Sequence, residues 1–246
     1  GSKVSEEEHF FNRVIVFYLE KIEFHLKWLL LGGTLVLIVL SIAGIKKIRV
    51  DTNLIHDLKA DSPIAIATRF IDNHLTGVYS LGISIARRDP ASRVNVETLK
   101  KIDGLAQFLE SQPEIRKANS LSTIIKKIHE ARVGDPTGFR IPEDDETLQD
   151  YVERMAESNN PDFWSFISRD FRQMRLEARM KAVGTEKGRA LETRIWNYVK
   201  AHFGEEYEVK ITGSVVLLGQ MSERLVNNQM ESLGIAFLVI LTLISL

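Results

Sequence analysis

Residues 28–45 read WLLLGGTLVLIVLSIAGI, a run of 18 residues without a charge or a proline, and Lys27 and Lys46 lie on either side of it. A helix of this length spans about 27 Å, close to the roughly 30 Å hydrocarbon core of a bilayer. The flanking lysines can keep their ammonium groups among the headgroups. The alternatives are a helix buried in a large soluble core and a signal peptide, which would be shorter and followed by small residues. The run therefore predicts a transmembrane helix.

Residues 1–27 lead into this run and are amphipathic. From Glu6 onward apolar side chains recur at helical spacing, and Glu20 and Lys21 fall on the opposite side. We expect a helix that lies in the membrane interface, with a partner-binding helix as the alternative. Basic residues are nearly balanced before and after the run, so the charge distribution does not orient the span.

The composition excludes several classes of function. The chain has 32 Lys and Arg against 33 Asp and Glu, so the near-neutral charge argues against a nucleic-acid partner. There is no cysteine, and the six histidines are scattered without metal-ligand spacing. No Gly-x-Ser-x-Gly element and no phosphate-binding glycine loop is present. We therefore expect no enzyme activity, no catalytic residue, no metal and no cofactor.

Four segments after the run alternate apolar and polar residues with the period of a β-strand. The clearest alternation follows Gln173, where every second residue is Gln, Arg, Glu or Lys. The alternation is weakest around Ile115. The predicted strands cover residues 81–86, 115–121, 173–182 and 207–212.

Helical periodicity fills the intervals between these strands. Val96–Gln112 and Glu186–Phe203 each have one apolar face, and Pro113 and Gly204 end them. The resulting order is strand, helix, strand, a helical insertion over about residues 122–170, then strand, helix and strand. This order predicts a split βαβ (ferredoxin-like) domain, with a four-stranded antiparallel sheet and two helices on one face.

A further helix is predicted ahead of the first strand. Ser62 can cap it, and Pro63 suits its first turn because the missing N–H would have no helical partner. Ile64, Ala67 and Ile71 form its predicted apolar stripe.

The end of the chain is apolar again. Beyond Glu231 no residue is charged, and Leu233–Leu246 is 14 residues of predicted helix, too short to cross a bilayer. We expect a fragment cut inside a second span. The predicted division is a lead-in helix over 1–27, a transmembrane helix over 28–45, an extramembrane α/β domain over 46–228, and the start of a second span over 229–246.

Short segments between these elements form a pattern of their own. They are Val50–Leu54, Asp61–Ile64, Phe70–Gly77, Asn119–Leu121, Arg140–Pro142, Phe171–Arg172 and Ile211–Ser214. Their order and spacing over about residues 28–246 resemble the RND superfamily, and within it the MMPL-type predicted exporters. The resemblance implies an α+β membrane protein, in which transmembrane helices flank a porter-type domain. The chain would then be the first span, the porter-type domain and the start of the next span of one of two repeats.

The resemblance also implies a function. Such proteins are proton-driven exporters of lipids or other hydrophobic molecules, multi-pass in the bacterial inner membrane with the porter domain facing the periplasm. The proton relay would lie in later spans, so this chain would contribute extracytoplasmic substrate path and assembly surface. Its partners would be the membrane, a hydrophobic substrate, and further copies or accessory proteins. The alternative is a membrane-tethered interaction or assembly domain of a translocation accessory protein.

Aromatic residues are the candidates for the substrate path, because their large contact area suits acyl chains. They are Tyr79, Phe163, Trp164 and Phe166, with ordinary core packing as the alternative for each. Five residues of the family-like segments are expected in structural roles as turn, capping or glycine positions. They are Asp51, Asn53, Asp61, Gly77 and Gly213.

Overall fold

The computed structural model describes residues 29, 32–34, 36–37, 40–41, 59, 61–89 and 93–245. The chain divides into two units, Gly1–Arg49 and Val50–Leu246, and the fold below is that of the second unit. The described residues between 29 and 41 are helical. The predicted lead-in helix and most of the predicted span over 28–45 lie outside the described residues.

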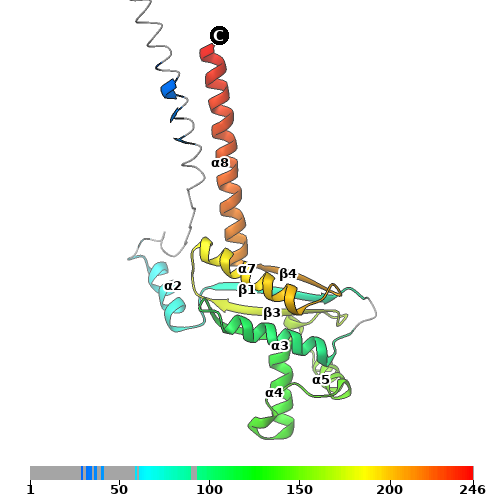
Figure 1. The fold of residues 1–246 in the computed structure, drawn as a ribbon. Coiled ribbons are helices and arrows are strands. Elements are labelled where there is room, and N and C mark those ends of the chain that lie inside the picture. The colour runs from blue at the N-terminus through cyan, green and yellow to red at the C-terminus, as the bar shows by residue number, and fades with distance from the viewer. Residues whose placement is uncertain are drawn as a thin grey trace, which may run out of the picture. The chain divides into compact units, whose positions relative to one another are not determined.

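The second unit is built on a four-stranded sheet with strand order β2-β3-β1-β4, in which all neighbours are antiparallel. The strands are β1 (Tyr79–Arg87), β2 (Ile115–Ser120), β3 (Gln173–Met180) and β4 (Tyr207–Gly213). Helices α3 (Val96–Glu110) and α7 (Thr185–His202) follow β1 and β3 and lie on one face of the sheet (Figure 1). The unit is therefore an α+β fold with split βαβ connectivity.

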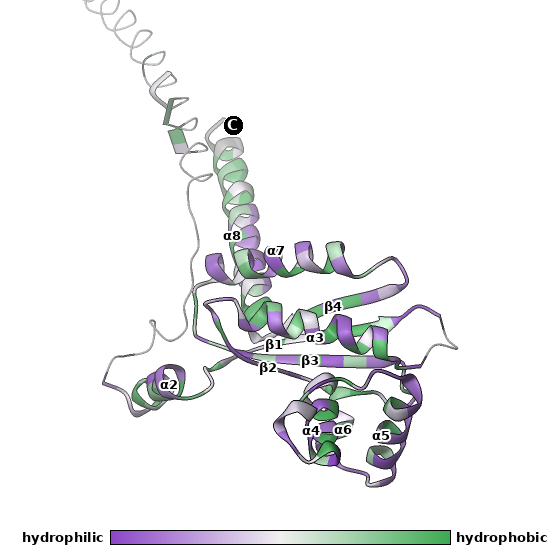
Figure 2. Cartoon of the chain, turned by 60° about the horizontal axis from the view of Figure 1, so that its bottom comes forward, coloured by the Kyte–Doolittle hydropathy of each residue, from purple (hydrophilic) through white to green (hydrophobic). Residues whose placement is uncertain are grey.

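The insertion between β2 and β3 is helical. It consists of α4 (Leu121–Val133), the 3-10 helix η1 (Pro136–Gly138), α5 (Asp145–Glu157) and α6 (Pro161–Phe166). These helices gather beneath the sheet in the views of Figures 1 and 2. Capping residues fix their starts: the Asp144 carboxylate accepts the Thr147 N–H at 2.7 Å, and the Asn160 side chain accepts the Asp162 N–H at 2.9 Å.

Alternation along the strands gives the sheet two different faces. Leu81, Ile83 and Ile85 of β1 are buried against α3 and α7, together with Leu176 of β3. The residues that alternate with these buried positions along β1, β3 and β4 point to the opposite face, which is called the open face below. They are Gly82, Ser84, Gln173, Arg175, Glu177, Arg179, Glu208, Lys210 and Thr212.

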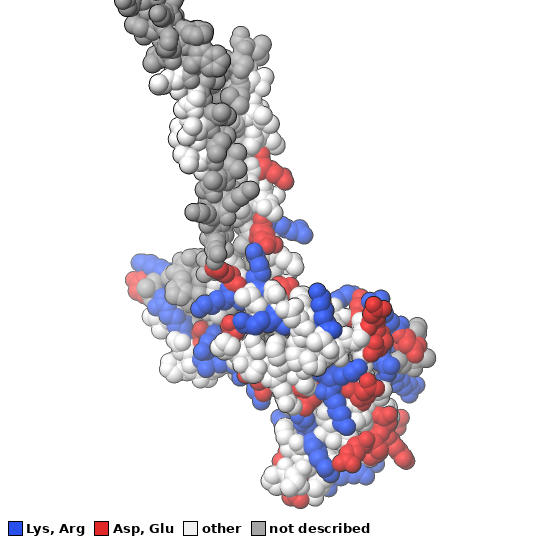
Figure 3. Space-filling model, viewed as in Figure 1, with Lys and Arg blue, Asp and Glu red and all other residues white. Residues whose placement is uncertain are grey.

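Helix α8 (Ser214–Ser245) starts directly after β4 and corrects the membrane prediction. It begins with polar as well as apolar residues, carries Glu223, Arg224 and Glu231, and becomes uncharged only beyond that point (Figures 2 and 3). Within the described residues, no helix combines the length and the apolar character that crossing a bilayer requires. The predicted fold class, with transmembrane helices flanking the sheet domain, is therefore wrong. The predicted multi-pass location in the bacterial inner membrane is corrected with it.

Helix α2 (Pro63–His74) starts as predicted but turns its predicted apolar stripe outward. The Ser62 hydroxyl accepts the Ala65 N–H at 3.2 Å, and Ala65 is the buried residue of the helix. The Asp72 carboxylate accepts the Ala182 N–H at 2.7 Å and so anchors the helix to the residue after β3. Ile64, Ala67 and Ile71 are consequently exposed.

Candidate functional site

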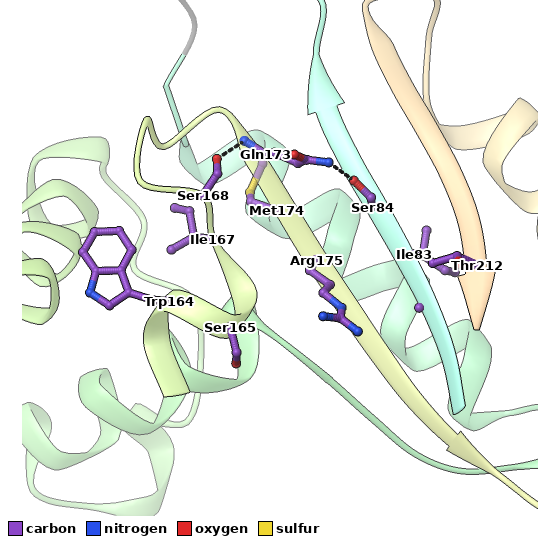
Figure 4. Close-up of a pocket in the computed structure, with 11 residues that line it drawn as sticks. Ile83, Ser84, Trp164, Ser165, Ile167, Ser168, Gln173, Met174, Arg175 and Thr212 are labelled. Carbon is purple, nitrogen blue, oxygen red and sulfur yellow. Dashed lines mark hydrogen bonds between the residues drawn. The ribbon is translucent and has the colours of Figure 1, made fainter. Parts of the chain in front are cut away.

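A groove of about 330 Å³ lies between the open face of the sheet and the segment from α6 to β3 (Figure 4). We call it the sheet groove. The sheet side is formed by β1, β3 and β4, and the other side by α6 and the residues that lead into β3. Its lining residues are Gly82, Ile83, Ser84, Trp164, Ser165, Ile167, Ser168, Gln173, Met174, Arg175 and Thr212.

The floor of the sheet groove depends on a missing side chain at Gly82. A Cβ atom there would lie 3.3 Å from the Thr212 methyl carbon and 3.8 Å from the Arg175 guanidinium. The Arg175 guanidinium therefore lies close to the glycine on the open face. Figure 4 shows the Arg175 side chain extending from β3. Among the described residues, no carboxylate forms an ion pair with Arg175. The groove thus offers an exposed cation with fork-shaped donor geometry.

The opposite end of the sheet groove is apolar. Ile167 and Met174 are buried there and face one another across an isolated antiparallel bridge. The half-buried Trp164 ring stands edge-on to Phe163, with 5.1 Å between ring centroids, and the Arg169 guanidinium lies 4.7 Å from its centroid. The groove therefore combines an apolar end with a cationic end.

A tight turn between α6 and β3 fixes the rim of the groove. The Gln173 N–H donates to the Ser168 hydroxyl oxygen at 2.9 Å, and that hydroxyl donates to the Asp170 carboxylate at 2.5 Å. The Ser168 hydroxyl and the Arg172 N–H hold the pKa of Asp170 below its ordinary value by hydrogen bonding to the ionised form. Asp170 is therefore ionised at neutral pH and keeps Ser168 oriented towards Gln173.

This turn predicts a pH dependence. The folded-state pKa of Asp170 is depressed, so the ionised carboxylate stabilises the folded turn. This stabilisation is present above the unfolded-state pKa of Asp170 and is lost as the pH falls through the folded-state pKa. Asp170→Asn should imitate the acid state at neutral pH. We expect severalfold faster hydrogen exchange at the Gln173 amide, measured by NMR. Asp162→Asn is the control, since no described hydrogen bond involves that carboxylate; equal exchange in both variants would contradict this role for Asp170.

The four predicted path residues do not come together in one place. Trp164 lines the sheet groove, whereas Phe163 is fully buried behind it and Phe166 packs against the core. Tyr79 is buried at the start of β1, where it pairs with Met180 on the face covered by α3 and α7. Of the four, Trp164 alone belongs to the groove.

The structure describes three of the five residues predicted to have structural roles. Asp51 and Asn53 lie outside the described residues. Asp61 is exposed just before α2, and its carboxylate lies 3.5 Å from the Lys59 ammonium nitrogen. Gly77 and Gly213 have φ angles of +84° and +120°, and a Cβ atom would lie 2.2 Å from the Met180 carbonyl oxygen and 2.4 Å from the Ser80 carbonyl oxygen, respectively. Both positions therefore require glycine.

Sequence reasoning missed the polar part of the groove. The sequence pattern did place the polar lining residues on the predicted polar side of their strands, and this was the signal by which they could have been found. They are Gly82, Ser84, Arg175 and Thr212. The small residues on that side of β1 mark the place where a groove can form. The position of α6 against them has no counterpart in the sequence pattern.

Comparison with known proteins adds no family assignment. No protein-family model matches the chain, and no curated protein is significantly similar to it. The resemblance to the RND superfamily therefore depends on the short segments quoted above.

Proposed function

We propose that the described domain is a porter-type domain of an RND-type exporter of lipids or other hydrophobic molecules. In this role it supplies substrate path and assembly surface. The proposal is supported by the order of the family-like segments and by the split βαβ connectivity. It assigns no membrane-crossing helix to the described residues.

The observation that carries the proposal is the chemistry of the sheet groove. The half-buried Trp164 offers apolar surface beside the buried Ile167 and Met174, and the exposed Arg175 supplies a cation without a carboxylate partner among the described residues. The volume of about 330 Å³ lies within the range of small-molecule sites. An amphiphile with an acyl chain and an anionic headgroup satisfies both ends, because its carboxylate or phosphate can pair with the guanidinium in a bidentate manner.

Quenching of Trp164 fluorescence by a brominated fatty acid tests this proposal on the full chain. The chain has three tryptophans, so replacing Trp28 and Trp196 by phenylalanine leaves Trp164 as the reporter. We expect saturable quenching, because bromine on the bound acyl chain comes close to the ring. Arg175→Gln should weaken binding about tenfold, since a charge-assisted hydrogen bond contributes about 1.5–3 kcal/mol.

Arg179→Gln is the matched control. Arg179 lies four residues further along β3 on the same face, outside the sheet groove, and its guanidinium lies 3.8 Å from the Glu177 carboxylate. It should bind the fatty acid like the parent. Absence of quenching, or equal weakening by both substitutions, would contradict the assignment of the groove as substrate path.

A second candidate function is an interaction or assembly domain. It is favoured by α2, which exposes Ile64, Ile66 and Phe70 although the helix is anchored to the sheet domain through Asp72. Exposed apolar surface of this kind is typical of protein contacts. Failure of the full chain to retain any fatty acid would favour this second function over the first.

A further inference from the structure

Strand β4 is an edge of the described sheet, and its outward backbone groups can be assigned. At one end of the β1–β4 pairing, the Arg88 N–H donates to the Glu206 carbonyl at 2.8 Å. At the other end, the Ser80 N–H donates to the Ser214 hydroxyl at 2.9 Å. The residues of the β4 segment that bond to β1 therefore have even numbers. Bonded pairs alternate along an antiparallel ladder. The N–H and C=O groups of Val209 and Ile211 therefore point away from β1.

The core beside this edge is incompletely covered. Val209 and Ile211 are half-buried, whereas their β1 partners Ile85 and Ile83 are fully buried. A hollow of about 250 Å³ lies next to them, between β4 and α7. Its lining residues are Arg88, Trp196, Val199, Lys200, Phe203, Gly204, Tyr207, Glu208 and Val209. The edge thus combines outward hydrogen-bonding groups with an unfilled apolar hollow.

The open-face side of β4 carries charges of opposite sign. Glu208 and Lys210 lie on either side of Val209, with 2.8 Å between carboxylate oxygen and ammonium nitrogen. A two-fold axis beside Val209, midway between this strand and an antiparallel copy of it, would place each charge opposite its counterpart of opposite sign. The strand is therefore complementary in charge to an antiparallel copy of itself.

We propose that β4 pairs antiparallel with β4 of a second copy of this chain, around a two-fold axis at Val209. Each Glu208 then lies opposite Lys210 of the second copy, and each Tyr207 lies opposite Ile211 of the second copy. The two Val209 residues exchange a pair of backbone hydrogen bonds, and each Ile211 N–H donates to the Tyr207 carbonyl across the axis. The two sheets become one continuous sheet, with an isologous interface.

The charges select this register over its neighbours. Sliding the second strand by two residues places Glu208 opposite Glu208 in one direction and Lys210 opposite Lys210 in the other, and like charges directly opposite are destabilising. Sliding it by one residue sets the apolar side of one strand against the polar side of the other. The selected register also brings the Ile211 side chain of the second copy beside Tyr207, at the hollow next to α7.

A disulfide cross-link tests the register on the full chain, which has no cysteine of its own. Residues that form a hydrogen-bonded antiparallel pair have Cα atoms about 5.5 Å apart, within the range of a disulfide. Val209→Cys should therefore give a covalent dimer on mild oxidation. Ile211→Cys is the control, because its two copies would lie about 14 Å apart. A monomeric Val209→Cys variant, or equal cross-linking of both variants, would overturn the proposal.

A charge exchange tests the pairing without a cross-link. In the proposed dimer, residue 208 of each copy lies opposite residue 210 of the other, so there are two such pairs. Either single substitution, Glu208→Lys or Lys210→Glu, puts like charges in both pairs. Each should therefore weaken dimerisation at least tenfold, measured by sedimentation equilibrium. The double variant E208K/K210E restores both pairs and should dimerise like the parent. Circular dichroism melts of the same samples show whether each monomer is folded. Dimerisation of the folded single variants at parental strength, or no recovery in the folded double variant, would overturn the proposal.

Discussion

Phe163→Ala is expected to lower the free energy of unfolding by about 3–5 kcal/mol, the range for a large buried aromatic residue. Phe163 has no exposed surface, and it belongs to the cluster that joins the helical insertion to the sheet. Its removal leaves a cavity beside Trp164, whose ring centroid lies 5.1 Å away. Urea denaturation followed by circular dichroism measures the loss as a lower midpoint with an unchanged slope.

Phe139→Ala provides the control for this prediction. Phe139 lies in the same insertion but is 47% exposed, and the Lys126 ammonium nitrogen lies 5.6 Å from its ring centroid. We expect a loss of about 1 kcal/mol or less, because little apolar surface is returned to water. The pair also separates the two interpretations of Phe163. A stable Phe163→Ala variant that no longer binds the fatty acid would favour the substrate path over core packing.

The sheet was largely predictable because its central strands alternate strictly. Gln173–Met180 places a polar or charged residue at every second position, and a one-residue slip would bury these side chains. β2 was harder to predict, since Arg116 and Lys117 are adjacent and both exposed. The structure explains this through a register irregularity between Ile115 and Lys117. A bulge interrupts the period of two on which strand prediction depends.

The helices show what periodicity leaves open. An apolar stripe predicts that a helix has a buried side and an exposed side, but it does not identify which other element packs against the buried side. In α2 the hydrogen bond from the Ala182 N–H to Asp72 turns Ala65 inward and leaves Ile64 and Ile71 exposed. That contact joins residues 110 positions apart in the chain and has no local signature.

The candidate site was predictable only in its parts. Aromatic density drew attention to the segment around Phe163, and the structure divides it between the core and the groove. Strand alternation placed Arg175 and Thr212 on the polar side of the sheet. Their meeting with Trp164 depends on how the insertion packs, which is a tertiary property.

The last prediction concerns Gly77, which lies in the segment 75–78 between α2 and β1. Gly77 and Gly134 have nearly the same φ, +84° and +85°. Their surroundings differ, because a Cβ atom at Gly77 would lie 2.2 Å from the Met180 carbonyl oxygen. A Cβ atom at Gly134 would have no neighbouring atom within 4 Å. Gly134→Ala should cost about 1 kcal/mol, the strain of left-handed backbone. Gly77→Ala should cost about 2–4 kcal/mol, because overlap with the backbone adds to the same strain. Urea denaturation of the two variants isolates the overlap, and equal losses would contradict a close approach of Gly77 to the end of β3.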